Sequence, residues 1–284
     1  MGSAFALLSS PNRGFVARPG LLAAEAGTIR AMSTSRLDLL QAFDGLLEPA
    51  RFKDYGPNGL QVEGKSAVRR IVSGVTASLA LIEAAVAAEA DAIFVHHGLF
   101  WRGQSGTVTG WMKQRLALLL RHDINLYAYH LPLDAHPTLG NNAQLGLQLG
   151  LVGAGQFGDS ALGFLGQRAD GGQFDSAVAL AAHIENKLNR AVTLVPGAGA
   201  AIKKIAWCTG GAQGYFEAAI AAGADAFITG EISEPQAHYA RECGVAFIAC
   251  GHHASERYGA PAVAAHVAAQ LGLEHRFIDI DNPA

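Results

Sequence analysis

Two stretches decide the fold of this chain: Ile71–Gly98, which reads IVSGVTASLALIEAAVAAEADAIFVHHG, and Ile205–Glu231, which reads IAWCTGGAQGYFEAAIAAGADAFITGE. At one constant offset, Glu83 of the first stretch coincides with Glu217 of the second, and an Ala-Asp-Ala triplet also coincides. Each stretch has a short apolar run, an alanine-rich helical segment and a second apolar run, which is the pattern of a βαβ unit. The sequence therefore predicts two similar α/β halves that arose by internal duplication.

The similarity continues on both sides of each unit. A strand is expected before each unit, at 58–62 and 192–196, and a helix and another strand after it, at 124–129 and 245–250. Alternating strands and helices favour mostly parallel or mixed sheets flanked by helices. The weakly patterned, glycine-rich segment Gly153–Gly172 is expected to be the crossing between the halves.

The domain organisation follows from these patterns. Residues 1–31 resemble a transit peptide in composition, with three arginines and a single acidic residue, but an upstream start or a disordered extension is the stronger interpretation. A capped helical pattern begins after Met32, so we exclude the leader from the fold. We expect a first half over 32–150 and a second half over 151–284, whose C-terminal part (245–284) returns to the first half.

Composition narrows the class of protein. The chain has 284 residues, enough for a large core, and 16% of them are charged, below the ~25% of an average soluble domain. Its 21 basic and 24 acidic residues argue against a nucleic-acid or anionic-membrane binder, and no uncharged apolar run approaches the ~20 residues of a membrane span. The three cysteines lack metal-binding spacing, which favours a reducing, cytoplasmic location.

Imidazole and carboxylate side chains follow three of the expected strands. The carboxyl ends of parallel strands meet at one edge of a sheet, so we expect these side chains to lie close together. They are His96, His97, His130, Asp134, His252, His253 and Glu256. Imidazole and carboxylate together are the ligands that Zn, Mn and non-haem Fe prefer.

The spacing of these residues predicts two ions per subunit rather than one. His96 and His97 are neighbours in an extended chain and point to opposite sides, so their rings reach two ions more easily than one. Two ions ~3.5–4 Å apart need bridging oxygens, for which Asp134 and Glu256 are the candidates. His252 and Glu256 stand four residues apart, on one face of an expected helix. We expect two divalent ions, Zn, Fe or Mn, and a metal site completed by the C-terminal part of the chain.

The sequence leaves the roles of three further residues undecided. His130 could bind an ion, orient a substrate or only pack. Glu231 occupies in the second stretch the position of His97 in the first, and it is either a substrate contact or supporting acid, or a solvated carboxylate. His253 points away from Glu256 on the expected helix, so it is a structural residue or one that supports the ligands.

Five separated motifs resemble the NIF-three-like family, whose bacterial members are usually described as GTP cyclohydrolase type 2 homologues. In order, the motifs are DYGPNGLQVEG from Asp54, HHG from His96, HLPLDAH from His130, DAFITGE from Asp225 and GHHASER from Gly251. The resemblance runs from about Leu37 to Pro283, and the chain lacks the inserted domain of some longer relatives. It implies a toroidal hexamer of two-domain α/β subunits, each with a dinuclear metal centre. It carries the ligand role onto His96, His97, Asp134, His252 and Glu256.

Two other motifs are rejected. Gly59–Ser66 (GLQVEGKS) matches the P-loop pattern, but a P-loop follows a strand and opens a helix, whereas Leu60–Val62 is itself strand-like. Cys250 precedes His252 and His253, a hint of a nucleophile pair, but it ends an apolar run and is expected to pack in the core.

These patterns favour a metal-dependent hydrolase that acts on a small nucleotide or phosphoester. Two divalent ions lower the pKa of a shared water to near neutrality and stabilise a developing oxyanion. Arg102, Lys113 and Arg257 could meet a phosphate, although such residues are more often solvated surface charges. The alternative is a non-catalytic metal-binding ring that acts as a metallochaperone, a storage protein or a regulatory scaffold.

The first testable prediction concerns assembly. Low charge and alanine-rich helices leave more apolar surface than a monomer of this size comfortably exposes, and the family resemblance implies a ring of six. Metal sites that face an internal chamber would meet small molecules only. Light scattering at low micromolar concentration should give about six times the chain mass of 29.6 kDa, and a monomer would contradict the expectation.

Overall fold

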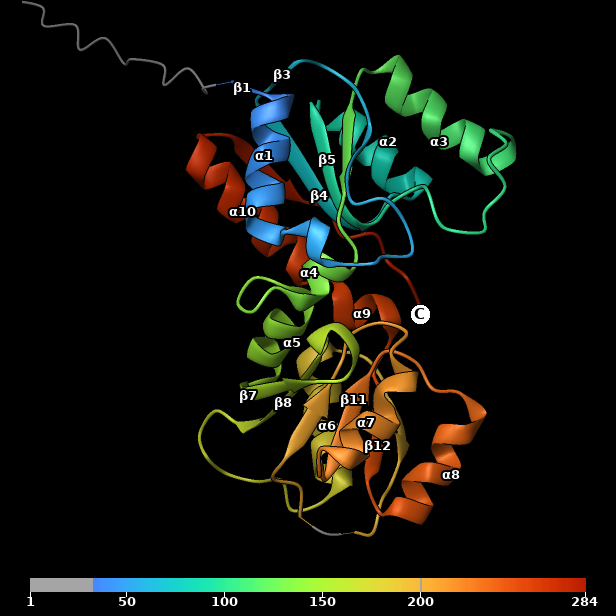
Figure 1. Cartoon of the computed structure of the whole chain (residues 1–284), viewed down its shortest axis with the longest axis vertical. Coiled ribbons are helices and arrows are strands. Elements are labelled where there is room, and N and C mark those ends of the chain that lie inside the picture. Colours follow the sequence, from blue (N-terminus) through green and yellow to red (C-terminus); the bar gives the residue numbers. More distant parts are fainter. Residues whose placement is uncertain (1–32, 200) are drawn as a thin grey trace, which may run out of the picture. The chain divides into compact units, whose positions relative to one another are not determined.

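The computed structural model describes residues 33–199 and 201–284, so the expectation for residues 1–31 lies outside the described residues. The described chain forms two large mixed sheets flanked by helices, which confirms the α/β class (Figure 1). A two-stranded antiparallel sheet, β1 (Thr34–Ser35) with β3 (Ala67–Val68), precedes them. Among the described helices, none is long and apolar enough to cross a membrane.

The first large sheet has five strands in the order β13-β4-β5-β6-β2. The strands are β2 (Gly59–Val62), β4 (Arg70–Thr76), β5 (Ala92–His97), β6 (Asn125–Ala128) and β13 (Glu274–Phe277). Strands β13, β4, β5 and β6 are parallel, and β2 pairs with β6 in the antiparallel direction. The last strand of the chain therefore belongs to the first sheet.

The second sheet has six strands in the order β7-β8-β10-β11-β12-β9. The strands are β7 (Leu151–Phe157), β8 (Gly163–Arg168), β9 (Thr193–Val195), β10 (Ile205–Trp207), β11 (Ala226–Thr229) and β12 (Ala246–Ala249). Strands β10, β11 and β12 are parallel, and β9 pairs antiparallel with β12 as β2 does with β6. The order β4-β5-β6-β2 in the first sheet is thus repeated as β10-β11-β12-β9 in the second, as the paired sequence stretches predict.

The prediction that Gly153–Gly172 is a crossing between the halves is wrong. Strands β7 and β8 form an antiparallel pair over this segment and extend the second sheet. The glycines allow close backbone packing rather than a linker, because a Cβ on Gly166 would collide with the carbonyl oxygen of Val152. Because glycines replace apolar side chains where the two backbones approach each other, the sequence of these strands lacks a clear hydrophobic pattern.

Helices cover both faces of each sheet. On the first sheet, α1 (Arg36–Leu47) and α10 (Gly259–Leu271) pack on one face, and α2 (Leu79–Ala87) and α3 (Gly110–Arg121) on the other. On the second sheet, α5 (Asn141–Leu149) and α6 (Ala177–Leu188) share one face. The opposite face carries α7 (Phe216–Ala221) and α8 (Glu234–Cys243). The short helices α4 (Leu131–Ala135) and α9 (His252–Glu256) follow β6 and β12.

The apolar strands of the sequence are buried on both faces. Ile71 of β4 packs under α1 and α10, whereas its neighbour Val72 packs under α2 and α3. Strands of this kind read as continuous apolar runs rather than alternating ones. Ser35 and Ser78 accept hydrogen bonds from backbone N–H groups in the first turns of α1 and α2, which sets where these helices begin.

The start of α5 joins the two sheets. The backbone carbonyl of Asn142 accepts a hydrogen bond from the indole of Trp207 (2.9 Å), and its side-chain oxygen accepts one from the backbone N–H of Thr209 (2.9 Å). Asn141 accepts one from the backbone N–H of Gly259, at the start of α10 (3.0 Å). The two asparagines therefore tie the end of β10 and the start of α10 to one helix terminus.

We predict that Asn142→Ala lowers the free energy of unfolding by about 2–4 kcal/mol, because it leaves a buried N–H of Thr209 without its acceptor. Urea unfolding of the metal-free protein measures the effect. The control is Gln114→Ala, on the exposed face of α3, which should leave the midpoint unchanged. Equal midpoints for both variants would contradict this role of Asn142.

Candidate metal centre

The structure brings the five predicted ligands together where the two halves meet. His96 and His97 end β5, Asp134 lies in α4, and His252 and Glu256 are the first and last residues of α9. Their ligand atoms form three overlapping groups, within each of which all atoms lie within 4.8 Å of one another. The groups are His96, Asp134 and Glu256; His97, His252 and Glu256; and His96, His97 and His130. These buried and half-buried groups could hold a metal ion.

Glu256 lies at the middle of the cluster. Its Oε1 is 3.4 Å from Nε2 of His96, while its Oε2 is 3.3 Å from Nε2 of His97 and 3.1 Å from Nε2 of His252. Nε2 of His96 is also 3.6 Å from Oδ1 of Asp134. One buried carboxylate thus faces three imidazoles, with its two oxygens turned to different rings.

The outer nitrogen of each of these three imidazoles already has a partner. Nδ1 of His96 is 3.1 Å from the carbonyl oxygen of Tyr129. Nδ1 of His97 is 3.0 Å from the hydroxyl of Thr76, and Nδ1 of His252 is 2.6 Å from the carboxylate of Glu231. Partners at Nδ1 fix the ring orientation and leave Nε2 as the ligand atom, as in metal sites generally.

Two atoms of the cluster are buried without a hydrogen bond. Among the residues that the structure describes, Nε2 of His96 and Oε2 of Glu256 have no hydrogen-bond partner. The 3.1 Å contact of Glu256 with His252 is close in distance but lacks hydrogen-bond geometry. Buried polar atoms of this kind need a partner, and a cation between them would supply one. The residues present therefore fit a metal ion.

The charges of the cluster are strongly coupled. Burial opposes the charging of His96, but Asp134 and Glu256 outweigh it and raise its pKa to about 9. Burial and the neighbouring His96 lower the pKa of His97 to about 3. Burial alone would raise the pKa of Glu256, yet the adjacent imidazoles hold it well below its usual range. A bound cation would take the place of the proton on His96, since a ligating imidazole must be neutral.

Asp134 is positioned by side chains that the sequence reasoning missed. Its Oδ1 accepts hydrogen bonds from Nδ2 of Asn141 (2.8 Å) and from the hydroxyl of Thr209 (3.3 Å). Its backbone carbonyl accepts one from Asn142 (3.2 Å). Burial and the nearby Glu256 carboxylate raise the pKa of Asp134. The adjacent asparagines, seven and eight residues after Asp134, were the available signal.

His130 belongs to the cluster through a second missed residue, Asp54. Nδ1 of His130 is 2.7 Å from Oδ1 of Asp54, and its ring centroid is 5.0 Å from that of His96. Asp54 also accepts hydrogen bonds from the backbone N–H of Leu131 and from Asn58. Burial would raise the pKa of Asp54, but His130 and Asn58 lower it. The carboxylate therefore fixes the orientation of His130.

Of the other residues predicted near the site, some adjoin the cluster and others lie away from it. Glu231 supports His252 from the solvent side, while His253 points away from the cluster and lies 3.0 Å from Asp279. Arg257 also pairs with Asp279, and Lys113 lies exposed on α3. Arg102 alone of the three predicted phosphate contacts adjoins the cluster, because its guanidinium donates to the carbonyl of Asp54 (2.6 Å).

Both rejected motifs are structural, as predicted. Strand β2 occupies Gly59–Val62 and β3 follows it, so Gly59–Ser66 connects strands rather than opening a helix. Cys250 is buried, and this burial raises the pKa of its thiol to about 12, which disfavours the thiolate form near neutral pH.

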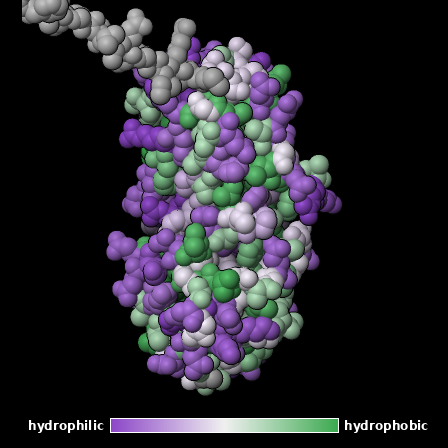
Figure 2. Space-filling model, turned by 90° about the vertical axis from the view of Figure 1, so that its left-hand side faces the viewer, coloured by the Kyte–Doolittle hydropathy of each residue, from purple (hydrophilic) through white to green (hydrophobic). Residues whose placement is uncertain are grey.

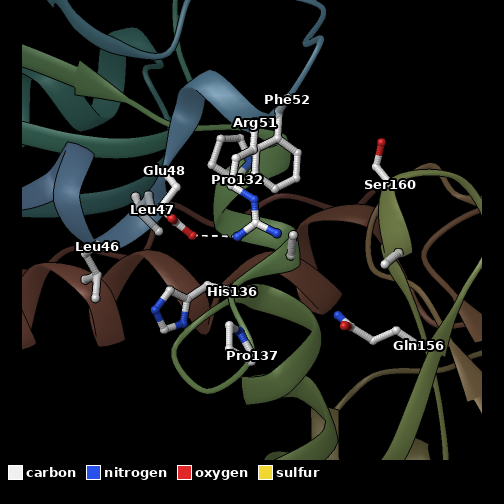
Figure 3. A pocket seen from close by; sticks show the side chains of 12 residues that line it. Leu46, Leu47, Glu48, Arg51, Phe52, Pro132, His136, Pro137, Gln156 and Ser160 are labelled. Atoms are coloured by element: carbon white, nitrogen blue, oxygen red, sulfur yellow. Dashed lines mark hydrogen bonds and ion pairs between the residues drawn. The ribbon is translucent and has the colours of Figure 1, made fainter.

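A separate pocket of about 340 Å³ lies beyond α4, and none of the described residues predicted for the metal site lines it. Figure 3 shows the guanidinium of Arg51 entering this pocket in an ion pair with Glu48 (2.6 Å), while Gln156 approaches from the opposite wall. With its charge already paired, Arg51 gives the pocket no free cationic group.

Known proteins similar to this chain identify its family. The Duf34/NIF3 (NGG1p interacting factor 3) family matches residues 34–283. The chain belongs to the Duf34/NIF3 family. A relative called "GTP cyclohydrolase 1 type 2 homolog" from Neisseria meningitidis is 52% identical over 249 residues, which cover 88% of this chain and 99% of the relative. One of the same name from Pseudomonas aeruginosa is 51% identical over 256 residues, covering 89% and 100%.

The NIF3-family fold is also found among solved structures. Protein ybgI, described as of unknown function, matches with a TM-score of 0.84 and 46% identity, over 88% of this chain and all of that one. The family model and the similar relatives confirm the family predicted from the five motifs, and this solved structure shares the fold.

Gly210 leaves room for the central carboxylate. Its φ of +70° is left-handed, and a Cβ there would collide with Oε1 of Glu256 and lie 3.2 Å from Nε2 of His252. We predict that Gly210→Ala lowers the affinity for Zn²⁺ at least 100-fold while the protein stays folded. Metal titration and circular dichroism measure the two effects.

Gly214→Ala is the matched control, because a Cβ at Gly214 has nothing within 4 Å. It should bind metal like the wild type. Unchanged affinity in Gly210→Ala would show that Glu256 does not have to occupy its present position.

Proposed function

We propose that this chain binds two divalent metal ions and hydrolyses a small nucleotide or phosphoester. The observation that carries the proposal is the position of Glu256 between His96 on one side and His97 and His252 on the other. A carboxylate with its two oxygens turned to different imidazoles is placed to bridge two ions.

The ligand groups divide naturally around this carboxylate. His96 and Asp134 would hold one ion, and His97 and His252 the other, with Glu256 shared between them. This mixture of nitrogen and oxygen donors suits Zn, Fe or Mn better than Mg or Ca, which prefer oxygen alone.

The chain's own residues have defined tasks in such a hydrolysis. When bound, two divalent ions lower the pKa of water and polarise the bond to be cleaved. Glu231 holds His252 in orientation, and Asn141 and Thr209 hold Asp134. The ionised Asp54 accepts from Nδ1 of His130, which leaves Nε2 of that ring free to accept a hydrogen bond from a substrate.

The substrate class rests on two supports. The bacterial relatives are called GTP cyclohydrolase 1 type 2 homologues, which points to a nucleotide. Arg102 is the predicted phosphate contact that is hydrogen-bonded to Asp54, the residue that orients His130. A non-catalytic ring that stores or delivers metal is the second candidate, and the deep burial of His96 and Glu256 favours it.

We also propose that the chain assembles as a homo-oligomer, a ring of six in the simplest form. Figure 2 shows hydrophobic residues exposed among hydrophilic ones on one face. Leu147 and Val152 are 72% and 47% exposed, and they border a groove of about 510 Å³ beside the edge strand β7. An exposed strand edge with apolar neighbours is a surface that a second copy can cover.

The proposed function predicts two equivalents of metal and an activity that depends on them. Elemental analysis of purified protein, followed by titration with Zn²⁺ or Mn²⁺, should approach two ions per chain. The metal-loaded protein should hydrolyse at least one member of a nucleotide and phosphoester panel, and Asp134→Asn should lower the rate at least 100-fold.

Two outcomes would contradict the proposal in different ways. Saturation at one equivalent, unaffected by Glu256→Ala, would exclude the bridging role of Glu256. A fully loaded wild type without activity toward the panel would favour the storage or delivery ring.

A further inference from the structure

Two aromatic side chains stand beside the exposed side of the metal cluster. The ring of Trp101 has its centroid 5.9 Å from that of His97 and 5.1 Å from that of His130. Tyr55 lies 5.9 Å from His130 and is 59% exposed. His97 and His130 are themselves partly exposed, so these aromatic rings border the side from which a substrate reaches the cluster.

The two aromatic residues are held in place by their loops. The backbone N–H of Arg102 donates to the carbonyl of Tyr55 (2.7 Å), and the Arg102 guanidinium donates to the carbonyl of Asp54 (2.6 Å). Gly56 permits this close approach, because a Cβ there would collide with the carbonyl oxygen of Phe100. The backbone segments that carry the two rings are therefore held together before a ligand binds, which reduces the entropy cost of binding.

Neither aromatic residue is buried, since Tyr55 is exposed and Trp101 is half-buried. Trp101 meets His130 at an interplanar angle of 90°, and Tyr55 meets the same ring at 67°. An edge-to-face contact uses at most one face of each ring. The crevice lined by Trp101, His130 and His96 has only about 10 Å³ of free space, room for at most one water molecule. A flat ligand therefore meets the aromatic rings from the solvent side rather than inserting behind them.

We propose that Trp101 and Tyr55 form a stacking surface for a planar heteroaromatic ring, so that the substrate of this site carries a base next to the bond presented to the metal cluster. The inference rests on the proposed function and narrows its substrate class. Stacking on an aromatic side chain tolerates different bases, since each has a π face. The surface thus selects for the presence of a base more than for its identity.

The test compares two probes that differ by the base alone. GMP and ribose 5-phosphate share a phosphorylated ribose, and their dissociation constants are measured by equilibrium dialysis with the metal-loaded protein at 4 °C. GMP should bind about tenfold more tightly, which corresponds to about 1.4 kcal/mol. In Trp101→Leu this ratio should fall to about one, with the affinity for ribose 5-phosphate unchanged.

Trp111→Leu is the matched control, because Trp111 lies on α3 and is 52% exposed. It should keep the tenfold ratio. Tyr55→Leu tests the surface at a side chain whose exposure makes misfolding no concern, and it should lower the ratio as well. A ratio near one in the wild type, or a tenfold ratio kept in both Trp101→Leu and Tyr55→Leu, would overturn the proposal.

Failure of the proposed function gives a different result. In that case the metal-loaded wild type would hydrolyse nothing in the panel and yet would still prefer GMP to ribose 5-phosphate. A wild type that hydrolyses phosphoesters without preferring GMP would overturn the stacking surface alone.

Discussion

The buried carboxylate of Glu256 is the constraint on which the rest of this structure depends. It is 3% exposed and faces three imidazoles, so its negative charge must be balanced within the protein. The surrounding chain is arranged to allow this. Gly210 leaves space for one oxygen of this carboxylate, and its backbone N–H donates a hydrogen bond to the hydroxyl of Ser255, the neighbour of Glu256 in α9. Glu231 contacts Nδ1 of His252 and so orients its Nε2 toward Glu256.

The two halves contribute unequally to the site, and this explains why both are needed. The first half supplies His96, His97 and Asp134 from the ends of β5 and β6, while the second supplies His252 and Glu256 after β12. After these residues α10 packs on the first sheet and β13 pairs with β4, so the chain returns to the first sheet directly after the second half's contribution to the cluster. A shift of one half relative to the other would separate Glu256 from His96, which links the packing of the halves to metal affinity.

Much of the fold could be predicted from the sequence because its signals are local. The repeated βαβ pattern, and the polar residues that follow apolar strands, depend on residues close together in the chain. The β7–β8 pair could not be predicted, because its glycines are explained only by the backbone of the opposite strand. Asp54 was missed for a similar reason, since its partner His130 lies 76 residues away. Asn141 lies only seven residues after Asp134, so its support of that carboxylate was within reach of the sequence.

The most direct test of this account is a crystal structure of the metal-loaded protein with data collected at the absorption edge of the bound metal. We expect two anomalous peaks about 3.5–4 Å apart, one beside His96 and Asp134 and the other beside His97 and His252, with Glu256 in contact with both. A single peak, or two peaks that leave Glu256 without a metal contact, would contradict the central claim that this carboxylate bridges two ions.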